Sequence, residues 1–253
     1  MPRYFIEVAY KGTRYAGFQI QQNANSIQAE IEKVLKIFFK EDFSLTCSSR
    51  TDAGVHALSN YFHFDNTSLP SHKILNNNIY NLNSILPDDI VVKQIYQVAG
   101  NSHSRFDALS RSYKYVLYQI KDPFVIDRAY YYPYNLDINK LQEAADVLAH
   151  YQDFTSFSKK NTQVKTFICK IIKSQWSIHD NLTVYNVEAN RFLRGMVRGL
   201  VGTMLKVGTG KITIAEFCDI IESKDCTKAD FSVPPQGLFL LNVNYQLTLL
   251  TPF

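Results

Sequence analysis

A repeated order of short strand and helix patterns constrains the fold of this chain most strongly. The first set runs strand, helix, strand, strand, helix, strand between Tyr4 and Val98, and a similar set returns between Arg111 and Tyr245. Each pattern is recognised by its apolar period, which is two residues for a strand and 3.6 for a helix. Such elements have one apolar face to bury against another layer. The order therefore predicts an α+β protein of two halves that share an antiparallel sheet.

Apolar spacing and local start signals place the individual elements. Ser26, for example, precedes apolar residues at helical spacing that begin with Ile27 and Ile31, which predicts a helix start. No Gly/Ser linker separates the halves, so we set the boundary at 104/105, with an N-terminal half of residues 1–104 and a C-terminal half of residues 105–253. We predict strands over residues 4–10, 43–49, 57–65, 89–98, 111–120, 164–178, 182–189 and 238–245, and helices over 27–38, 72–82, 141–150, 191–207 and 214–221.

The composition is that of an ordered globular protein, since 46% of the 253 residues are hydrophobic and 20% are charged. No apolar run reaches the roughly 18 residues that a membrane span needs, and the first residues lack the apolar core of a signal peptide. The four cysteines are scattered without a Cys-x-x-Cys pair. This pattern favours reduced thiols and a cytoplasmic location.

The positive charge is concentrated in one part of the chain. Residues 159–211 hold ten Lys or Arg against two acidic residues, Asp180 and Glu188, whereas the net charge of the whole chain is only +4. A cationic block on an otherwise acidic chain suits a polyanion, and nucleic acid is the commonest polyanion. A solvated basic face explains the charge equally well, so charge alone does not decide between the two.

The predicted helix over residues 191–207 combines arginines with glycines. At about 100° per residue, Arg191, Arg194 and Arg198 would lie on one face of it. Three glycines in this stretch cost about 1 kcal/mol each relative to Ala, which predicts a close approach of another chain segment. In the functional interpretation, the approaching group is a catalytic loop or a phosphate. In the structural interpretation, it is an ordinary packing partner, and the arginines extend to solvent.

A loop between two predicted strands contains Arg50, Asp52 and His56. Taken by itself, an Asp-x-Gly sequence is turn chemistry, because Asp caps the backbone and Gly adopts positive φ. The functional alternative is a carboxylate beside a guanidinium, which favours the ionised form. An ionised carboxylate in a cleft acts as a nucleophile or as a base.

The loop sequence Arg50-Thr51-Asp52-Ala53-Gly54-Val55-His56 resembles the signature of TruA-type pseudouridine synthases. Six further blocks resemble that family in the right order, so the resemblance covers nearly the whole chain. They are residues 10–19 (YKGTRYAGFQ), 26–28 (SIQ), 105–115 (RFDALSRSYKY), 153–157 (DFTSF), 189–198 (ANRFLRGMVR) and 237–245 (GLFLLNVNY).

The resemblance implies two RRM/ferredoxin-like α+β halves, helices on one side of the shared sheet, and a catalytic cleft between the halves. It implies that Asp52 is the catalytic aspartate, that Tyr113 stacks on the target base, and that Arg198 pairs with the aspartate. Arg50 would contact the RNA backbone, and Arg191 and Arg194 would add to substrate binding. The expected reaction isomerises uridine to pseudouridine at positions 38, 39 and 40 of the tRNA anticodon stem-loop. The resemblance further implies a homodimer and no cofactor.

Two other functions compete with this interpretation. A non-catalytic RRM-like RNA-binding module fits the basic block, but its usual aromatic signature is absent from the sequence. A glycoside hydrolase needs a second carboxyl group about 5–10 Å from Asp52, and the loop from Arg50 to His56 supplies none. The six histidines lack ligand spacing with any cysteine, so we expect no metal site.

Overall fold

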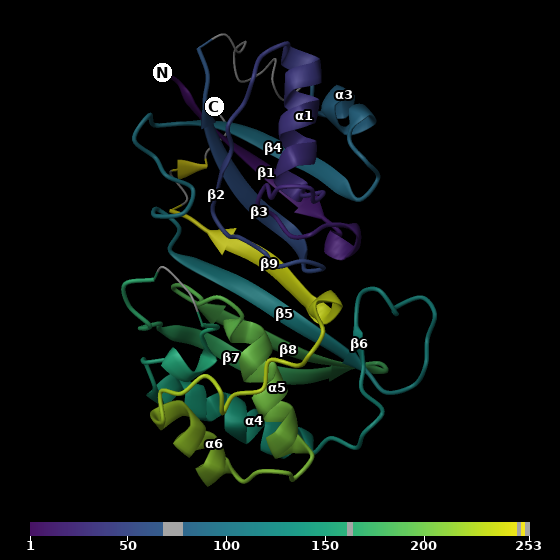
Figure 1. Ribbon diagram of the computed structural model, residues 1–253, viewed down its shortest axis with the longest axis vertical. Coiled ribbons are helices and arrows are strands. Elements are labelled where there is room, and N and C mark those ends of the chain that lie inside the picture. The colour runs from purple at the N-terminus through teal and green to yellow at the C-terminus, as the bar shows by residue number, and fades with distance from the viewer. Residues whose placement is uncertain (68–77, 161–163, 247–248, 251–253) are drawn as a thin grey trace. The chain divides into compact units, whose positions relative to one another are not determined.

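The computed structural model describes residues 1–67, 78–160, 164–246 and 249–250 (Figure 1). The chain is α+β, and its contacts divide it into two compact units. The first unit comprises Met1–Leu109 and Leu240–Phe253, and the second comprises Ser110–Phe239. No helix among the described residues is long and apolar enough to cross a membrane.

The sheet of the first unit is built around strand β1 (Arg3–Tyr10). Strands β3 (His56–Asp65) and β4 (Ile90–Val98) pair with it on either side, both antiparallel. The short strand β2 (Thr46–Cys47) adds to β3. The last strand, β9 (Leu238–Asn244), lies beside β3. The register brings Ile6, Phe62 and Ile95 level with one another in the middle of the sheet, and all three are fully buried.

Helix α1 (Ile27–Phe39) covers one face of this sheet (Figure 1). It begins where predicted, because the Ser26 hydroxyl accepts a hydrogen bond from the Ala29 amide at 3.3 Å. Its apolar face is buried, as the helical spacing requires. Phe18, in the segment between β1 and α1, stacks on Phe62 with ring centroids 4.8 Å apart. A shorter helix, α3, spans Ile79–Ile85, and most of the helix predicted over residues 72–82 lies outside the described residues.

The sheet of the second unit consists of strands β5 (Ser110–Tyr118), β8 (Leu182–Ala189) and β7 (Ile171–His179), paired antiparallel in that order. A two-residue strand, β6 (Tyr130–Tyr131), pairs with β5 in parallel. The prediction of a purely antiparallel sheet is therefore wrong at β6. This parallel pair is possible because a crossover of more than ten residues joins β5 to β6.

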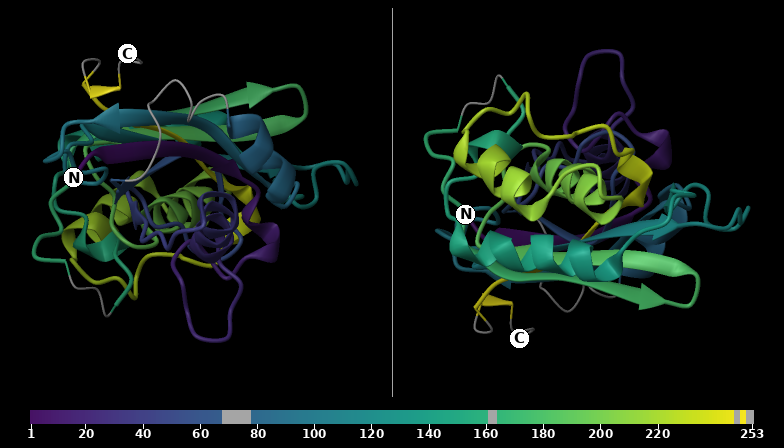
Figure 2. Two further views of the ribbon diagram at one scale, coloured as in Figure 1. Left: turned by 90° about the horizontal axis from the view of Figure 1, so that it is seen from above. Right: turned by 90° about the horizontal axis from the view of Figure 1, so that it is seen from below.

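Helices α4 (Ile138–Val147), α5 (Met196–Gly208) and α6 (Ile214–Glu222) pack in this second unit, where α4 contacts α5, α6 and β7 (Figure 2). Short 3-10 turns lie at Leu148–His150, Thr155–Phe157 and Pro235–Gly237, and a further one in the first unit at Gly12–Arg14. Nearly every residue of α5 is buried, so α5 is the central helix of this unit. Its Gly208 lies against Leu141 of α4, since an added Cβ would come within 2.7 Å of that side chain.

Candidate active site

The loop that carries Asp52 joins β2 to β3. Buried polar side chains of β1 and β3 hold it by hydrogen bonds. The Tyr10 hydroxyl and the Thr51 hydroxyl are hydrogen bonded at 2.8 Å. The Asn60 amide donates to the Ser49 carbonyl at 2.9 Å and to the Tyr10 hydroxyl at 3.1 Å. Asn60 is completely buried, and Tyr10, Ser49 and Thr51 are also buried. Hydrogen bonds in such surroundings are costly to lose, so they fix the base of the loop.

The segment that follows β1 holds the same loop from the other side. The Phe18 amide donates to the Thr51 carbonyl at 3.1 Å, and the Gly54 amide donates to the Tyr15 carbonyl at 3.3 Å. Gly12 lies so close that an added Cβ would be 2.0 Å from the carbonyl oxygen of Val55. No side chain fits in that space, so Gly12 is required by a backbone-to-backbone contact rather than by a turn.

The contacts of Tyr10, Asn60 and Gly12 form a clamp around the Asp52 loop, and His56 completes this clamp. The role of His56 was not predicted from the sequence. Its ring is 2% exposed, and its Nδ1 accepts a hydrogen bond from the Gly12 amide at 3.1 Å. An accepting Nδ1 carries no proton, so this contact requires the neutral ring with the proton on Nε2. The only sequence signal was the position of His56 within the heptamer, because its partner lies 44 residues away.

Asp89 supports the segment on which Tyr15 lies. Its carboxylate accepts from the Tyr15 hydroxyl and from Arg14 Nε, each at 2.7 Å. Burial alone would raise the pKa of Asp89, but the hydrogen bonds from Arg14 and Tyr15 outweigh it and lower that pKa. The ionised carboxylate therefore anchors the segment that clamps the Asp52 loop.

Asp52 lies at the tip of the loop, where a hydrogen bond from the Val55 amide to its own carbonyl at 3.2 Å and a φ of +77° at Gly54 make the turn. The side chain is half-buried, and Arg50 is exposed. Within the first unit, no described side chain forms an ion pair or hydrogen bond with the Asp52 carboxylate. The clamp therefore fixes the backbone of the loop. The Asp52 carboxylate takes no part in these contacts.

Arg50 does not form the ion pair with Asp52 that the sequence suggested. Its guanidinium lies within hydrogen-bonding reach of the Cys47 thiol. Burial raises the pKa of that thiol to about 11, and the charges of Arg50 and Arg105 oppose the increase only in part. Cys47 is thus a buried neutral thiol, and the charges of both arginines act on it.

Arg198 belongs to the second unit and lies on α5, two residues after the helix begins. Its Nε donates to the Val233 carbonyl at 2.8 Å, and its Nη2 donates to the Phe231 carbonyl at 3.3 Å. The same segment presses on the glycines of the helix, since a Cβ at Gly202 would be 2.2 Å from the carbonyl oxygen of Asp230. The predicted close approach to these glycines is confirmed, and its partner is the 230–231 segment, a packing partner rather than a phosphate.

Arg191 and Arg194 do not share a helical face with Arg198, so that prediction is wrong. Helix α5 begins at Met196, and Gly195 before it has a φ of +77°. This left-handed residue breaks the helical path, so both arginines lie in the preceding loop. Arg191 is half-buried and Arg194 is exposed. Lys159 donates its amide to the Arg194 carbonyl at 3.0 Å.

Tyr113 lies on β5 of the second unit, opposite Val187 of β8. Its ring is only 9% exposed, and the ring of Phe192 meets it edge-on with centroids 5.0 Å apart. Phe192 therefore sets the orientation of the Tyr113 ring.

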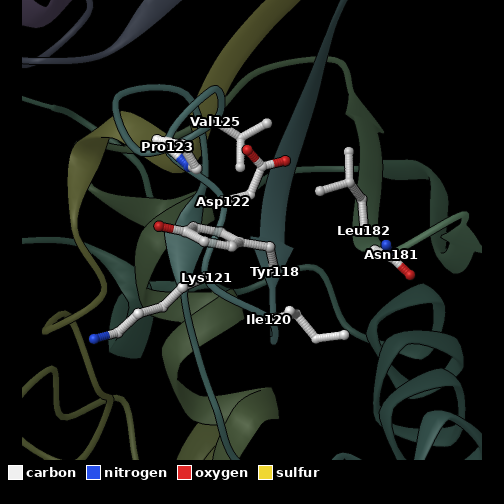
Figure 3. A pocket seen from close by; sticks show the side chains of 8 residues that line it. All are labelled: Tyr118, Ile120, Lys121, Asp122, Pro123, Val125, Asn181 and Leu182. Carbon is white, nitrogen blue, oxygen red and sulfur yellow. The ribbon is translucent and has the colours of Figure 1, made fainter.

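One hollow of this unit contains none of the predicted site residues (Figure 3). It has a volume of about 210 Å³ and lies between the segment after β5 and the β7–β8 turn. Its walls are mostly apolar, with Tyr118 and Val125 on one side and Leu182 on the other (Figure 3). Lys121 Nζ lies over the Tyr131 ring, 6.0 Å from the ring centroid. Among the described residues of the whole chain, no group of three or more His, Cys, Asp or Glu is arranged to hold a metal ion.

Comparison with known proteins agrees with the sequence resemblance. A family model described as tRNA pseudouridine synthase matches residues 144–246. The tRNA pseudouridine synthase A of Bacteroides fragilis is 46% identical over 246 residues, which cover 96% of each chain. The enzymes of the same name from Bacteroides thetaiotaomicron and Porphyromonas gingivalis are 44% and 42% identical, over 97% of this chain and 91% and 98% of theirs. The chain therefore belongs to the tRNA pseudouridine synthase A family, and it is an isomerase that forms pseudouridine in tRNA.

Proposed function

We propose that Asp52 is the catalytic carboxylate of this isomerase and that its substrates are the uridines at positions 38, 39 and 40 of the tRNA anticodon stem-loop. The observation that carries this proposal is the clamped loop. Buried hydrogen bonds from Tyr10 and Asn60 and the contact at Gly12 fix its backbone, while the carboxylate has no partner within its own unit. A rigid support for an unused acidic side chain is what a catalytic group requires.

The reaction breaks the bond between uracil N1 and the sugar C1′ and forms a bond between C5 and C1′. The C5 proton is lost to solvent and N1 gains a proton, so the product is an isomer of the substrate. Asp52 acts on the sugar, either by attack on C1′ or by proton removal that leads to a glycal. Both routes need the ionised carboxylate.

Arg198 is proposed to pair with Asp52 and keep it ionised. A guanidinium has five N–H donors, and the carbonyls of Val233 and Phe231 occupy two of the donor nitrogens. The second unit thus holds the guanidinium in one orientation and leaves further donors for a carboxylate. This arrangement suits a bidentate arginine–carboxylate pair.

Tyr113 is proposed to stack on the flipped uracil. A base inside a stem must leave the stack before it can react, at a cost of a few kcal/mol. Stacking on an aromatic ring recovers about 1–3 kcal/mol per base. The edge contact with Phe192 supports this role, since it orients the ring before the base arrives.

Arg50, Arg191 and Arg194 are proposed to bind the RNA backbone, and the absence of carboxylate ion pairs at all three among the described residues supports this. From the family resemblance we further propose two RRM-like halves, residues 1–104 and 105–253, that enclose the catalytic cleft, a homodimer, and a cytoplasmic location.

The test is tritium release from tRNA transcripts labelled at uridine C5, without added cofactor. Wild type should release tritium, and Asp52→Asn, which keeps the size of the side chain, should release none while still binding tRNA. Asp88→Asn is the matched control, because Asp88 is an exposed carboxylate of the same unit without a hydrogen bond or ion pair among the described residues. Substantial release by Asp52→Asn would remove Asp52 from the mechanism. Transcripts with uridine at a single one of the three positions would test the positions separately.

A further inference from the structure

A second hollow of the second unit is lined by basic side chains. It has a volume of about 350 Å³ and is lined by Thr155, Ser158, Lys159, Lys160, Phe167, Lys224, Asp225 and Cys226. A single water needs only about 10–15 Å³ of such space, so the hollow admits a larger group. None of its lining residues belongs to the proposed catalytic set.

The charges around this hollow favour an anion. Three of the lining residues are lysines and one is an acid. That acid, Asp225, accepts hydrogen bonds from the Thr227 amide at 2.9 Å and from the Thr227 hydroxyl at 2.8 Å, which lower its pKa and engage its carboxylate in its own turn. Lys224 is paired with Asp153 at 2.9 Å. Among the described residues, neither Lys159 nor Lys160 forms an ion pair. The charge of Lys160 helps to lower the pKa of Asp225, so the positive charge in excess comes from three lysines facing one lining acid.

Lys159 is held in place by Gly195. A Cβ at Gly195 would come within 3.0 Å of Lys159 Cγ and 3.2 Å of both Cδ and Cε, so the aliphatic part of Lys159 lies along the bare backbone of the glycine. The Lys159 amide is bonded to the neighbouring Arg194 carbonyl. The backbone and the aliphatic part of the side chain are therefore both in contact with the chain before any ligand binds, which reduces the entropy lost on binding.

We propose that this lysine hollow, defined by Lys159, Lys160 and Lys224, binds a backbone phosphate of the tRNA substrate. The inference rests on the proposed function and extends it. Ammonium groups bind phosphates as point charges, without reading the base sequence. The site would therefore add affinity and orientation for tRNA without taking part in the isomerisation. It also accounts for part of the basic block over residues 159–211, which the catalytic residues leave unexplained.

The first measurement is the affinity for unmodified tRNA at several KCl concentrations. The double variant Lys159→Gln/Lys160→Gln should bind roughly tenfold more weakly at low salt, as expected for loss of charged hydrogen bonds at a partly exposed site. The slope of log Kobs against log salt should become shallower by about 0.7–0.9, the contribution of one phosphate. At saturating tRNA, the single-turnover rate of tritium release should equal that of wild type.

The matched control is Lys140→Gln/Lys173→Gln, which removes the same charge from two exposed lysines of the same unit without ion pairs among the described residues. Equal losses of affinity in both double variants would show a general charge effect and overturn the site. An unchanged salt slope in the Lys159/Lys160 variant would overturn it as well.

A third arm separates an RNA phosphate from a free anion. Calorimetry with inorganic phosphate alone should show no binding tighter than a millimolar Kd. The property that changes in the Lys159/Lys160 variant should be the affinity for tRNA. Phosphate binding that is lost in the double variant while tRNA affinity stays at the wild-type value would assign the hollow to a small anion instead. Failure of the Asp52 proposal appears separately, as tritium release by Asp52→Asn.

Discussion

Gly12→Ala tests whether the clamp around the Asp52 loop is needed for activity. Gly12 does not have a positive φ, so alanine suits its backbone conformation, and the whole effect must come from the contact with Val55. The new Cβ would lie 2.0 Å from the Val55 carbonyl oxygen and 2.7 Å from its carbonyl carbon. Both atoms are backbone, so the loop itself must move.

The expected cost in stability follows from the terms that this movement changes. Overpacking of this kind costs about 1–3 kcal/mol. Weakening the hydrogen bond from the Gly12 amide to His56 adds about 0.5–1.5 kcal/mol. The lower entropy of the unfolded alanine chain returns about 0.4–1 kcal/mol. The free energy of unfolding should therefore fall by about 0.5–4 kcal/mol, which leaves a protein of ordinary stability folded.

The effect on activity should be larger than the effect on stability. A displacement of about 1 Å at a reacting group costs on the order of 100-fold in rate. We expect the single-turnover rate of tritium release to fall by at least tenfold, with tRNA affinity within a few-fold of wild type.

The control is Gly100→Ala, the same change in the same unit, where the nearest atom to a new Cβ is the Met1 carbonyl oxygen at 3.5 Å. This control should keep the wild-type rate and stability. A Gly12→Ala enzyme with the wild-type rate and a urea midpoint equal to that of Gly100→Ala would refute the clamp.

Three further predictions address the second unit and the pH response. Arg198→Lys keeps the charge but loses the forked contacts to the Val233 and Phe231 carbonyls, so the single-turnover rate should fall at least tenfold with tRNA affinity largely retained. Gly202→Ala places a Cβ 2.2 Å from the Asp230 carbonyl oxygen, and it should lower the free energy of unfolding by about 1–3 kcal/mol and reduce the rate; a wild-type rate in a folded Gly202→Ala enzyme would contradict the link to Arg198. Burial lowers the pKa of His63 from 6.5 to about 4. As the pH drops from about 6.5 to 4, the unfolded chain binds a proton at this histidine before the folded chain does, so the free energy of unfolding should fall. Urea midpoints across that range should show a smaller fall in His63→Gln than in wild type.

Elements with local signals were predicted well from the sequence. The Ser26 cap gives the start of α1, and the alternation over Leu182–Ala189 gives β8 with its exact bounds. The strand predicted over residues 43–49 is reduced to Thr46–Cys47, and that predicted over 164–178 begins only at Ile171. Both strands were predicted too long, because their bounds were taken from apolar content. A strand ends where its partner strand ends, and apolar content does not show that point.

The start of α5 shows a different limit of sequence reasoning. The apolar spacing continues back through Leu193, and nothing local distinguishes Gly195 from Gly199 and Gly202 inside the helix. What distinguishes it is its positive φ of +77°, which Gly199 and Gly202 do not have. This conformation, with the Lys159 side chain lying against it, excludes Arg191 and Arg194 from the helix, and local propensity does not show it.

The candidate site was predicted as a set of side chains, and the structure adds the backbone contacts that hold them. The heptamer identified Asp52, whose role stays a prediction. Of the partners that fix its loop, Asn60 lies in none of the resembling blocks, and Tyr10 lies in the block over residues 10–19 without a signal for this contact. At Gly12 and at Gly202, in separate units, a glycine meets a backbone carbonyl at a distance that no Cβ allows. A backbone contact has no side-chain proton to lose or gain, so it positions a neighbouring charged residue independently of pH. Gly12 and Gly202 therefore supply supports that do not titrate, beside the titratable contacts of His56 and Asp89 that also hold the Asp52 loop, so this part of the geometry stays fixed where those groups change charge.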